Sequence, residues 1–349
     1  MKRLNTRLIT PQLCAVILLI MLPLVSVLGL MTGPVFISLS DILSIMLAGD
    51  GAANGSNSQE KLIIEIIRLP RVMLSLIVGA LLAACGALLQ GLFRNPLADP
   101  ALIGVSAGAS VGASSVIVFG SMVNSGGVML GLSAISMGAF GGAIVASVII
   151  YRLATGPQGT SVATMLLAGI AISALAGAAT NTLSYLADND MLRRISLWQM
   201  GNLQGASWER VGLGALTAGC LAVLIPRETG ALNAMLLGES EARHLGINVE
   251  WLKRRLIIYS ALGVAISVAI AGVIAFVGLM VPHLIRLLVG PDHRSLLPLS
   301  ALAGAILLVA ADALARVVIA PAELPVGIVT SLLGAPFFLW LLVLQRGRS

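Results

Sequence analysis

Residues 100–151 read PALIGVSAGASVGASSVIVFGSMVNSGGVMLGLSAISMGAFGGAIVASVIIY and contain no charged side chain. A helix crosses the bilayer core with about 20 residues, so this stretch is too long for one crossing. Its glycine-rich middle, residues 120–131, divides it into two membrane-spanning helices. Over the 349 residues, 58% are hydrophobic and only 10% are charged, which predicts an all-α polytopic membrane protein in the lipid bilayer.

Apolar runs on both sides of this stretch predict ten spans in a single transmembrane domain covering residues 1–349. The run at residues 13–31 is longer than the core of a signal peptide, so a first span is preferred over a cleaved leader. Only a tight turn separates the seventh span from the eighth. Besides the pair within 100–151, the predicted spans are residues 13–31, 72–93, 161–187, 211–225, 256–271, 274–289, 297–318 and 326–344.

The basic residues predict the orientation, because cytoplasmic loops of membrane proteins are enriched in lysine and arginine. Ten spans place both termini on one side. If that side is the cytoplasm, it holds fourteen of the 21 basic residues: Lys2, Arg3, Arg7, Arg94, Arg152, Arg227, Arg243, Lys253, Arg254, Arg255, Arg286, Arg294, Arg346 and Arg348. Both termini are therefore expected in the cytoplasm.

Cysteine placement and the absence of a phosphate loop exclude several kinds of site. Cys14, Cys85 and Cys220 all fall inside apolar runs, so neither a disulfide framework nor a metal site is expected. The pattern G-x-x-x-x-G-K-[ST] is absent from the sequence, so ATP-driven work would have to come from another subunit. The chain is predicted not to be an enzyme, to hold no cofactor stably and to bind no nucleic acid.

One mixed-charge segment interrupts the apolar sequence, at about residues 230–248. Residues 232–246 read LNAMLLGESEARHLG, with Gly238 and Gly246 as helix stops. This composition suits two short helices at the membrane surface, against which a soluble partner could push. On composition alone, a solvated loop is the alternative.

Five stretches resemble a single family: RLPR (68–71), GALLQGLFRNPLADPALIGVSAGAS (86–110), LLGESEARHLG (236–246), FVGLMVPHLIR (276–286) and ELPVGIVTSLLGAPFFLWLL (323–342). In this order they resemble the FecCD-type permease subunits of ATP-binding-cassette (ABC) importers for iron siderophores, haem and cobalamin. The resemblance implies a homodimer in the bacterial inner membrane with one pore on its two-fold axis. It also implies two ATPase subunits on the cytoplasmic side and a periplasmic substrate-binding protein on the other.

The resemblance further assigns roles to particular residues. The coupling residues that receive the ATPase movement would be Leu236, Leu237, Gly238, Glu239, Glu241, Arg243 and Gly246. Arg68, Arg71 and Arg316 would pair with glutamates of the binding protein. Snorkelling at helix ends is the alternative for these arginines, and Arg316 could instead pair with Asp312 at i, i+4.

The loop TGPQGTS at residues 155–161 matches the position of the cytoplasmic gate in this family. The resemblance implies that Thr160 and Ser161 narrow the pore there. Small hydroxyl residues bind an anionic cargo weakly, which suits a gate that has to release it. Capping of the fifth span is the alternative role, and both roles could hold.

Haem is the predicted cargo, with a ferric siderophore or cobalamin as the alternative. The segment LWQMG at residues 197–201, together with the 93–110 and 239–246 stretches, most resembles haem importers. The residues themselves do not demand haem, because His244, His283 and His293 all fall on the cytoplasmic half.

Two other functional classes compete with this interpretation. Residues 104–108, GVSAG, match the G-x-S-x-G motif of serine hydrolases, with His283 as a candidate base, but the motif needs a strand–turn–helix context. An ion-coupled secondary transporter would need an ionisable residue near the membrane centre, for which Asp312 is the deepest candidate.

Overall fold

A computed structural model describes residues 8–48, 57–120, 134–157 and 159–346. Within these ranges the regular secondary structure is helical apart from one short hairpin, β1 (Thr155–Gly156) paired with β2 (Gly159–Thr160). Each predicted span corresponds to one helix: α1 (Pro11–Met31), α4 (Leu69–Leu92), α5 (Val105–Phe119), α6 (Ala134–Ala154), α7 (Val162–Leu186), α9 (Trp208–Leu224), α12 (Val249–Ala271), α13 (Val277–Val289), α14 (His293–Val317) and α15 (Val326–Arg346). The all-α polytopic fold is therefore confirmed.

Short helices connect these elements: α2 (Leu39–Ala48), α3 (Asn57–Leu62), η2 (Ile63–Arg68), η3 (Pro100–Ile103), α8 (Asn189–Gln199), η5 (Ile225–Glu228), α10 (Thr229–Met235) and α11 (Glu239–His244). Seven helices of the described ranges are long and apolar enough to cross a membrane. The helices α5 and α13 and the apolar part of α15 are shorter, although each lies where a span was predicted.

The boundary between the seventh and eighth spans differs from the prediction. Helix α12 begins at Val249, seven residues before the apolar run, because Asn248 caps it by accepting a hydrogen bond from the Trp251 amide (3.1 Å). Helix α13 begins at Val277 rather than residue 274, since Gly272 (φ 70°) and Phe276 (φ 67°) break the helical path. A loop of residues 272–276 therefore replaces the predicted tight turn.

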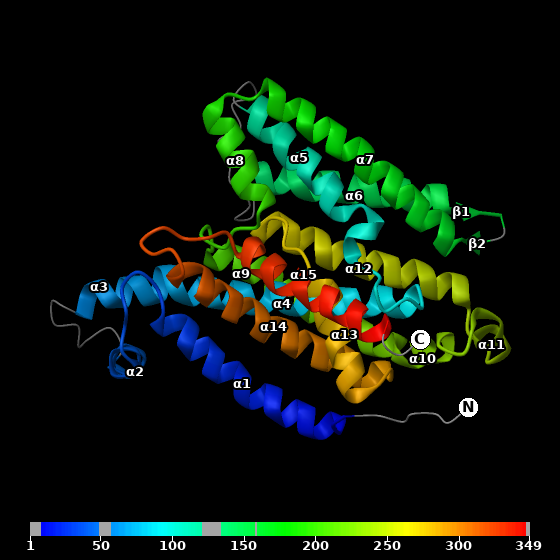
Figure 1. Cartoon of the computed structure of the whole chain (residues 1–349), viewed down its shortest axis with the longest axis horizontal. Helices are drawn as coiled ribbons and strands as arrows, with labels where there is room; N and C mark the ends of the chain where they lie inside the picture. The colour runs from blue at the N-terminus through cyan, green and yellow to red at the C-terminus, as the bar shows by residue number, and fades with distance from the viewer. Residues whose placement is uncertain (1–7, 49–56, 121–133, 158, 347–349) are drawn as a thin grey trace.

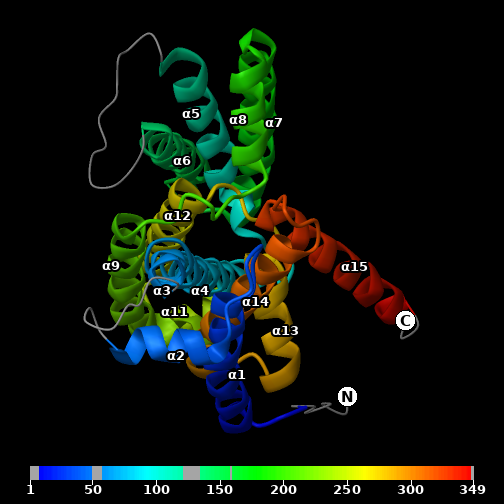
Figure 2. The ribbon, with the colours of Figure 1, turned by 90° about the vertical axis from the view of Figure 1, so that its left-hand side faces the viewer.

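Helix α4 forms the centre of the fold. It contacts α14, α12, α13 and α9, while α5, α6 and α7 form a second group that joins the first through α12 (Figures 1 and 2). Glycine pairs bring these helices together: a Cβ on Gly79 would overlap the Gly304 carbonyl, and one on Gly108 would overlap the Gly142 carbonyl. Close backbone approach through small residues is how helices associate in lipid.

Two helices leave large apolar faces uncovered. Helix α15 projects outward from the bundle, and α7 lies on the outer side of the group that it forms with α5 and α6 (Figure 2). Both expose large apolar side chains, among them Leu167 and Ile170 on α7 and Leu332, Leu339 and Trp340 on α15. Lipid or a second protein must cover these faces, because a contiguous apolar surface is not stable in water.

The two ends of the bundle carry different elements. At one end lie α10, α11 and the β1–β2 hairpin, together with the start of α1 and the end of α15 (Figure 1). At the other end lie α2, α3 and the start of α4. The first and last described helices thus have their chain ends on the side of the 230–248 segment.

Candidate functional site

The coupling segment, residues 230–248, forms two short helices joined at a glycine, as predicted. Helix α10 ends at Met235 and α11 begins at Glu239, with Gly238 between them at a φ of 132°. Side chains with a Cβ rarely adopt this conformation, so glycine permits the sharp change of direction. Leu236 and Leu237 are 42% and 68% exposed, whereas Met235 is fully buried. The two leucines are therefore available to a partner, and Met235 belongs to the core.

Helix α10 is fixed to the start of α14 by hydrogen bonds. Asn233 Nδ2 donates to Asp292 Oδ1 (2.6 Å), and the His293 amide donates to Asn233 Oδ1 (2.9 Å). Asp292 also accepts from the Arg294 amide, and this bond, with that from Asn233, holds the pKa of Asp292 below its usual value. Side-chain hydrogen bonds therefore tie α10 to the start of α14.

A cluster of charges connects the coupling segment to the start of α12. Lys253 Nζ lies 2.9 Å from Glu239 Oε2 and 3.4 Å from Glu250 Oε1. Arg243 lies 4.0 Å from Glu239 and 3.7 Å from Glu250. Exposed pairs such as those of Arg243 contribute about 0–1 kcal/mol, but Lys253 is only 4% exposed and depends on its partners.

The predicted gate residues lie in the hairpin that leads into α7. The Thr155 and Thr160 hydroxyls are 3.1 Å apart, and Thr160 is buried. The Thr160 amide donates to Glu250 Oε2 (2.7 Å), and the Thr160 carbonyl accepts from Lys253 Nζ (2.9 Å). Ser161 is exposed and caps α7 by accepting from the Thr164 amide (3.2 Å). The capping role is thus confirmed for Ser161, and the gate role stays a prediction.

Lys253 and Glu250 are functional candidates that sequence reasoning missed. They lie about 90 positions from Thr160, and nothing local in the sequence joins them to residues 155–161. The available signal was weak: Lys253 is one of three lysines in the chain, and it begins the KRR run (residues 253–255) that directly precedes an apolar run.

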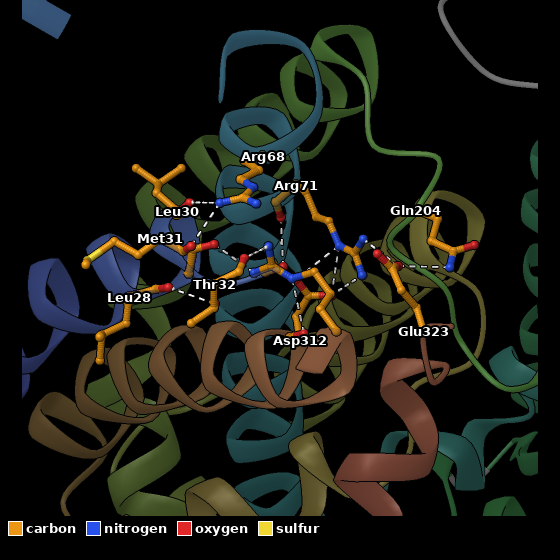
Figure 3. Close-up of polar contacts among 12 residues, drawn as sticks. Leu28, Leu30, Met31, Thr32, Arg68, Arg71, Gln204, Asp312 and Glu323 are labelled. Carbon is orange, nitrogen blue, oxygen red and sulfur yellow. Dashed lines mark hydrogen bonds and ion pairs between the residues drawn. The ribbon is translucent and has the colours of Figure 1, made fainter. Parts of the chain in front are cut away.

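The three arginines predicted to dock a partner lie at the opposite end, around the start of α4 and the end of α14, and their side chains are buried. Figure 3 shows Arg68 and Arg71 among their partners. Arg68 Nη1 donates to the carbonyls of Leu30 (2.5 Å) and Met31 (3.0 Å), and its Nη2 donates to that of Val35. Arg316 donates to the carbonyls of Gly29 (2.8 Å) and Thr32 (2.9 Å). These contacts hold the end of α1 and the chain after it against α4 and α14.

Arg71 is the centre of the same network. It bonds Asp312 Oδ1 through Nε (2.9 Å) and Nη2 (2.8 Å), and it bonds Glu323 Oε2 through Nη1 (2.9 Å). Arg316 Nε lies 3.2 Å from Asp312 Oδ2, so the predicted i, i+4 pair is confirmed. We call Arg68, Arg71, Asp312, Arg316 and Glu323 the arginine network.

The burial of these three arginines bears on the docking role predicted for them. Arg68, Arg71 and Arg316 are 4%, 5% and 2% exposed, so they do not snorkel at helix ends. Their guanidinium groups are bonded to this chain, and in this conformation none is presented to a partner's glutamates. Direct docking would require them to leave these bonds, so it stays a prediction that the arrangement does not favour.

Glu323 extends the arginine network to the loop before α9, because Gln204 Nε2 donates to Glu323 Oε2 (2.9 Å). Burial alone would raise the pKa of Glu323, but hydrogen bonds from Arg71 and Gln204 outweigh burial and lower the pKa below its usual 4.5. The ionised form therefore stabilises the fold above pH 4.5, and this contribution is lost as the pH falls through the lowered value.

We therefore expect acid to destabilise the wild-type chain more than a Glu323→Gln variant. Thermal unfolding in detergent, measured from pH 7 downward, should show the two stability curves converging below pH 4.5, with wild type more stable above it. Parallel curves at all pH values would contradict a structural role for ionised Glu323.

The two competing functions lack structural support. Residues 104–108 form the end of η3 and the first turn of α5, with Gly104 at a φ of 71°, so the strand–turn–helix context of a hydrolase is not present there. Asp312 is buried between Arg71 and Arg316, which explains it as an ion-pair partner rather than as a proton carrier.

Comparison with known proteins agrees with this architecture. A profile of the FecCD transport family matches residues 18–344. The chain is 49% identical to the hemin transport system permease protein HmuU of Yersinia pestis, over 80% of this chain and 83% of that protein. It is 45% identical to the cobalamin import system permease protein BtuC of Halobacterium salinarum, over 81% of this chain and 73% of that protein.

The fold also matches a solved structure. An ABC transporter described as of the metal-chelate type, in an inward-facing conformation, superposes with a TM-score of 0.79 at 30% identity. The match covers 96% of this chain and 99% of the other.

Proposed function

Because the chain belongs to the FecCD transport family and is the permease subunit of an ABC importer, we propose that it carries haem across the bacterial inner membrane. The observation that supports haem is the 49% identity to a hemin permease. Identity to the cobalamin permeases reaches 45%, so cobalamin is the alternative cargo, together with a ferric siderophore. Haem would be a transported substrate and not a resident cofactor.

The coupling segment would receive the ATPase subunits. Leu236, Leu237 and Leu245 are exposed beside Glu241 and Arg243, which gives an apolar patch with a charged rim. This combination is typical of the centre and edge of a protein interface. In this proposal the end of the bundle that carries α10 and α11 faces the cytoplasm, and both termini lie on that side.

A second copy of the chain would cover helices α7 and α15. The apolar faces of α7 and α15 are uncovered within one chain, and both helices border the same open side of the molecule (Figure 2). Pairing two copies there would bury these faces and place a path between them. A cavity of about 390 Å³ lies next to α15 and is lined by Met200, Ile328 and Leu332. The side chains of these three residues form an apolar surface suited to a flat aromatic cargo.

The mechanism would be alternating access. A periplasmic binding protein would deliver cargo at the end that carries the arginine network, and ATP binding and hydrolysis in the partners would change which side of the path is open. The Thr160 hairpin, which lies at the cytoplasmic end in this orientation, would open last. The arginine network would keep the delivery end assembled rather than contact the partner directly.

The deciding experiment is uptake into liposomes that contain this permease with the ATPase and binding protein of the same importer. We expect ATP-dependent uptake of haem, with a ferric siderophore and cobalamin tested in parallel. Uptake of another cargo but not haem would overturn the haem assignment and leave the importer architecture intact. Uptake that stops with an uncoupler and survives ATP depletion would refute ABC transport.

A further inference from the structure

We infer that Lys253 is the positioning residue that joins movement of the coupling helix α11 to the Thr160 hairpin. This inference rests on the proposed function, since it assumes that ATPase subunits push on α11. It adds a physical connection between that push and the hairpin that precedes α7, which lies at the same end of the bundle as α11.

The geometry makes Lys253 a shared partner of three elements. Its Nζ donates to Glu239 Oε2 on α11 (2.9 Å), to the Thr160 carbonyl in the hairpin (2.9 Å) and to Glu250 Oε1 in the first turn of its own helix (3.4 Å). Glu250 completes the loop, because its other oxygen accepts from the Thr160 amide (2.7 Å). Both backbone groups of Thr160 are thus held by side chains of α12.

The number of hydrogen-bond acceptors around Lys253 Nζ equals the number of donors that the ammonium group carries. An ammonium group has three N–H donors, and here three acceptors surround them. Because Lys253 is only 4% exposed, water has little access to replace a lost partner. Removing one partner from a buried charge costs far more than breaking a surface pair.

The free-energy cost of leaving the Lys253 ammonium without a partner is what would transmit movement from α11 to the hairpin. If α11 shifts and carries Glu239 with it, Lys253 either follows or loses its carboxylate. Following the shift changes the hydrogen bond to the Thr160 carbonyl, and the hairpin moves with it. The hairpin lies close against α12 at this point, since a Cβ built on Gly159 (φ 103°) would come within 2.5 Å of the Glu250 carboxylate carbon.

The test uses the assembled importer with Lys253→Met, which keeps the length of the side chain and removes its charge. Arg254→Met is the matched control, because it removes a positive charge from the next residue, which is exposed and stacks on Trp251 (5.4 Å). Hairpin movement is read from the labelling rate of Gly156→Cys, placed where a Cβ meets nothing within 4 Å, in a Cys220→Ser background.

In wild type and Arg254→Met, trapping the ATPase with vanadate should change the labelling rate at position 156. In Lys253→Met the ATPase should still bind and hydrolyse ATP, but the nucleotide-dependent change should disappear. Cargo moved per ATP should fall about tenfold, within the range of coupling between two sites. A purely structural role for Lys253 would lower stability without removing the nucleotide response.

Unchanged labelling response and unchanged cargo per ATP in Lys253→Met would overturn the inference. If that variant does not assemble, Glu239→Gln takes its place, since it removes the carboxylate that ties Lys253 to α11. Among complexes that still bind and hydrolyse ATP, it is expected to abolish the same response. Failure of the wild-type permease to bind an ATPase or move any cargo would instead refute the proposed function, so the two failures are distinguishable.

Discussion

Replacing Gly79 with leucine should prevent α4 and α14 from packing at their present distance and should sharply reduce the yield of folded protein. Any Cβ at position 79 would overlap the backbone carbonyl of Gly304, and a Cβ at position 304 would overlap that of Gly79. A backbone group cannot rotate away as a side chain can, so the helices must separate. Overpacking typically costs about 1–3 kcal/mol, and a clash with backbone belongs at the upper end of that range.

Thermal unfolding and size-exclusion profiles in detergent would measure this loss. Gly219→Leu on α9 is the matched control, because a Cβ there meets nothing within 4 Å and the residue is exposed. The control should retain wild-type stability. Equal losses at both positions would show that the substitution acts through membrane insertion or helix geometry in general, and not through the contact between α4 and α14.

The spans were predictable because hydropathy is a local property of the sequence. Each of the ten apolar runs became one helix, including α5 and α13, which are short. Helix ends were less predictable, since they depend on caps and backbone angles: Asn248 starts α12 outside its apolar run, and Phe276 delays α13. The contact between Gly79 and Gly304 was not predictable from the sequence, because it depends on how α4 packs against α14.

The candidate sites were predictable only where their residues are close in the sequence. The two short helices at Gly238 followed from a local pattern, and so did the pairing of Asp312 with Arg316. The bridge from Lys253 to Thr160 depends on the packing of α12 beside the hairpin, which no local pattern contains. The burial of Arg68 and Arg71 was missed for the same reason, since their partners come from α1 and α14.

Replacing Arg71 with methionine should destabilise the fold more than it affects any partner. The change removes the two hydrogen bonds from Arg71 to Asp312 and the one from Arg71 to Glu323. Asp312 is only 1% exposed. Removing one member of a buried ion pair costs about 3–5 kcal/mol where it leaves the other charge unpaired. The loss here belongs at the lower end of that range, because Arg316 still pairs with Asp312. Thermal unfolding of the purified permease would measure the loss, and Asp312→Asn should show a loss that is not additive with it.

Arg254→Met provides the comparison, because Arg254 is exposed and stacks on Trp251 at the surface (5.4 Å). An exposed cation–π contact contributes about 0.5–1 kcal/mol, so this variant should unfold close to wild type. Binding-protein affinity should be measured for both variants after correcting for the folded fraction. A stable Arg71→Met permease that no longer binds its partner would show that Arg71 leaves Asp312 on docking, and it would restore the contact role predicted from the sequence. A destabilised permease whose folded fraction binds normally would establish that the arginine network serves the fold itself.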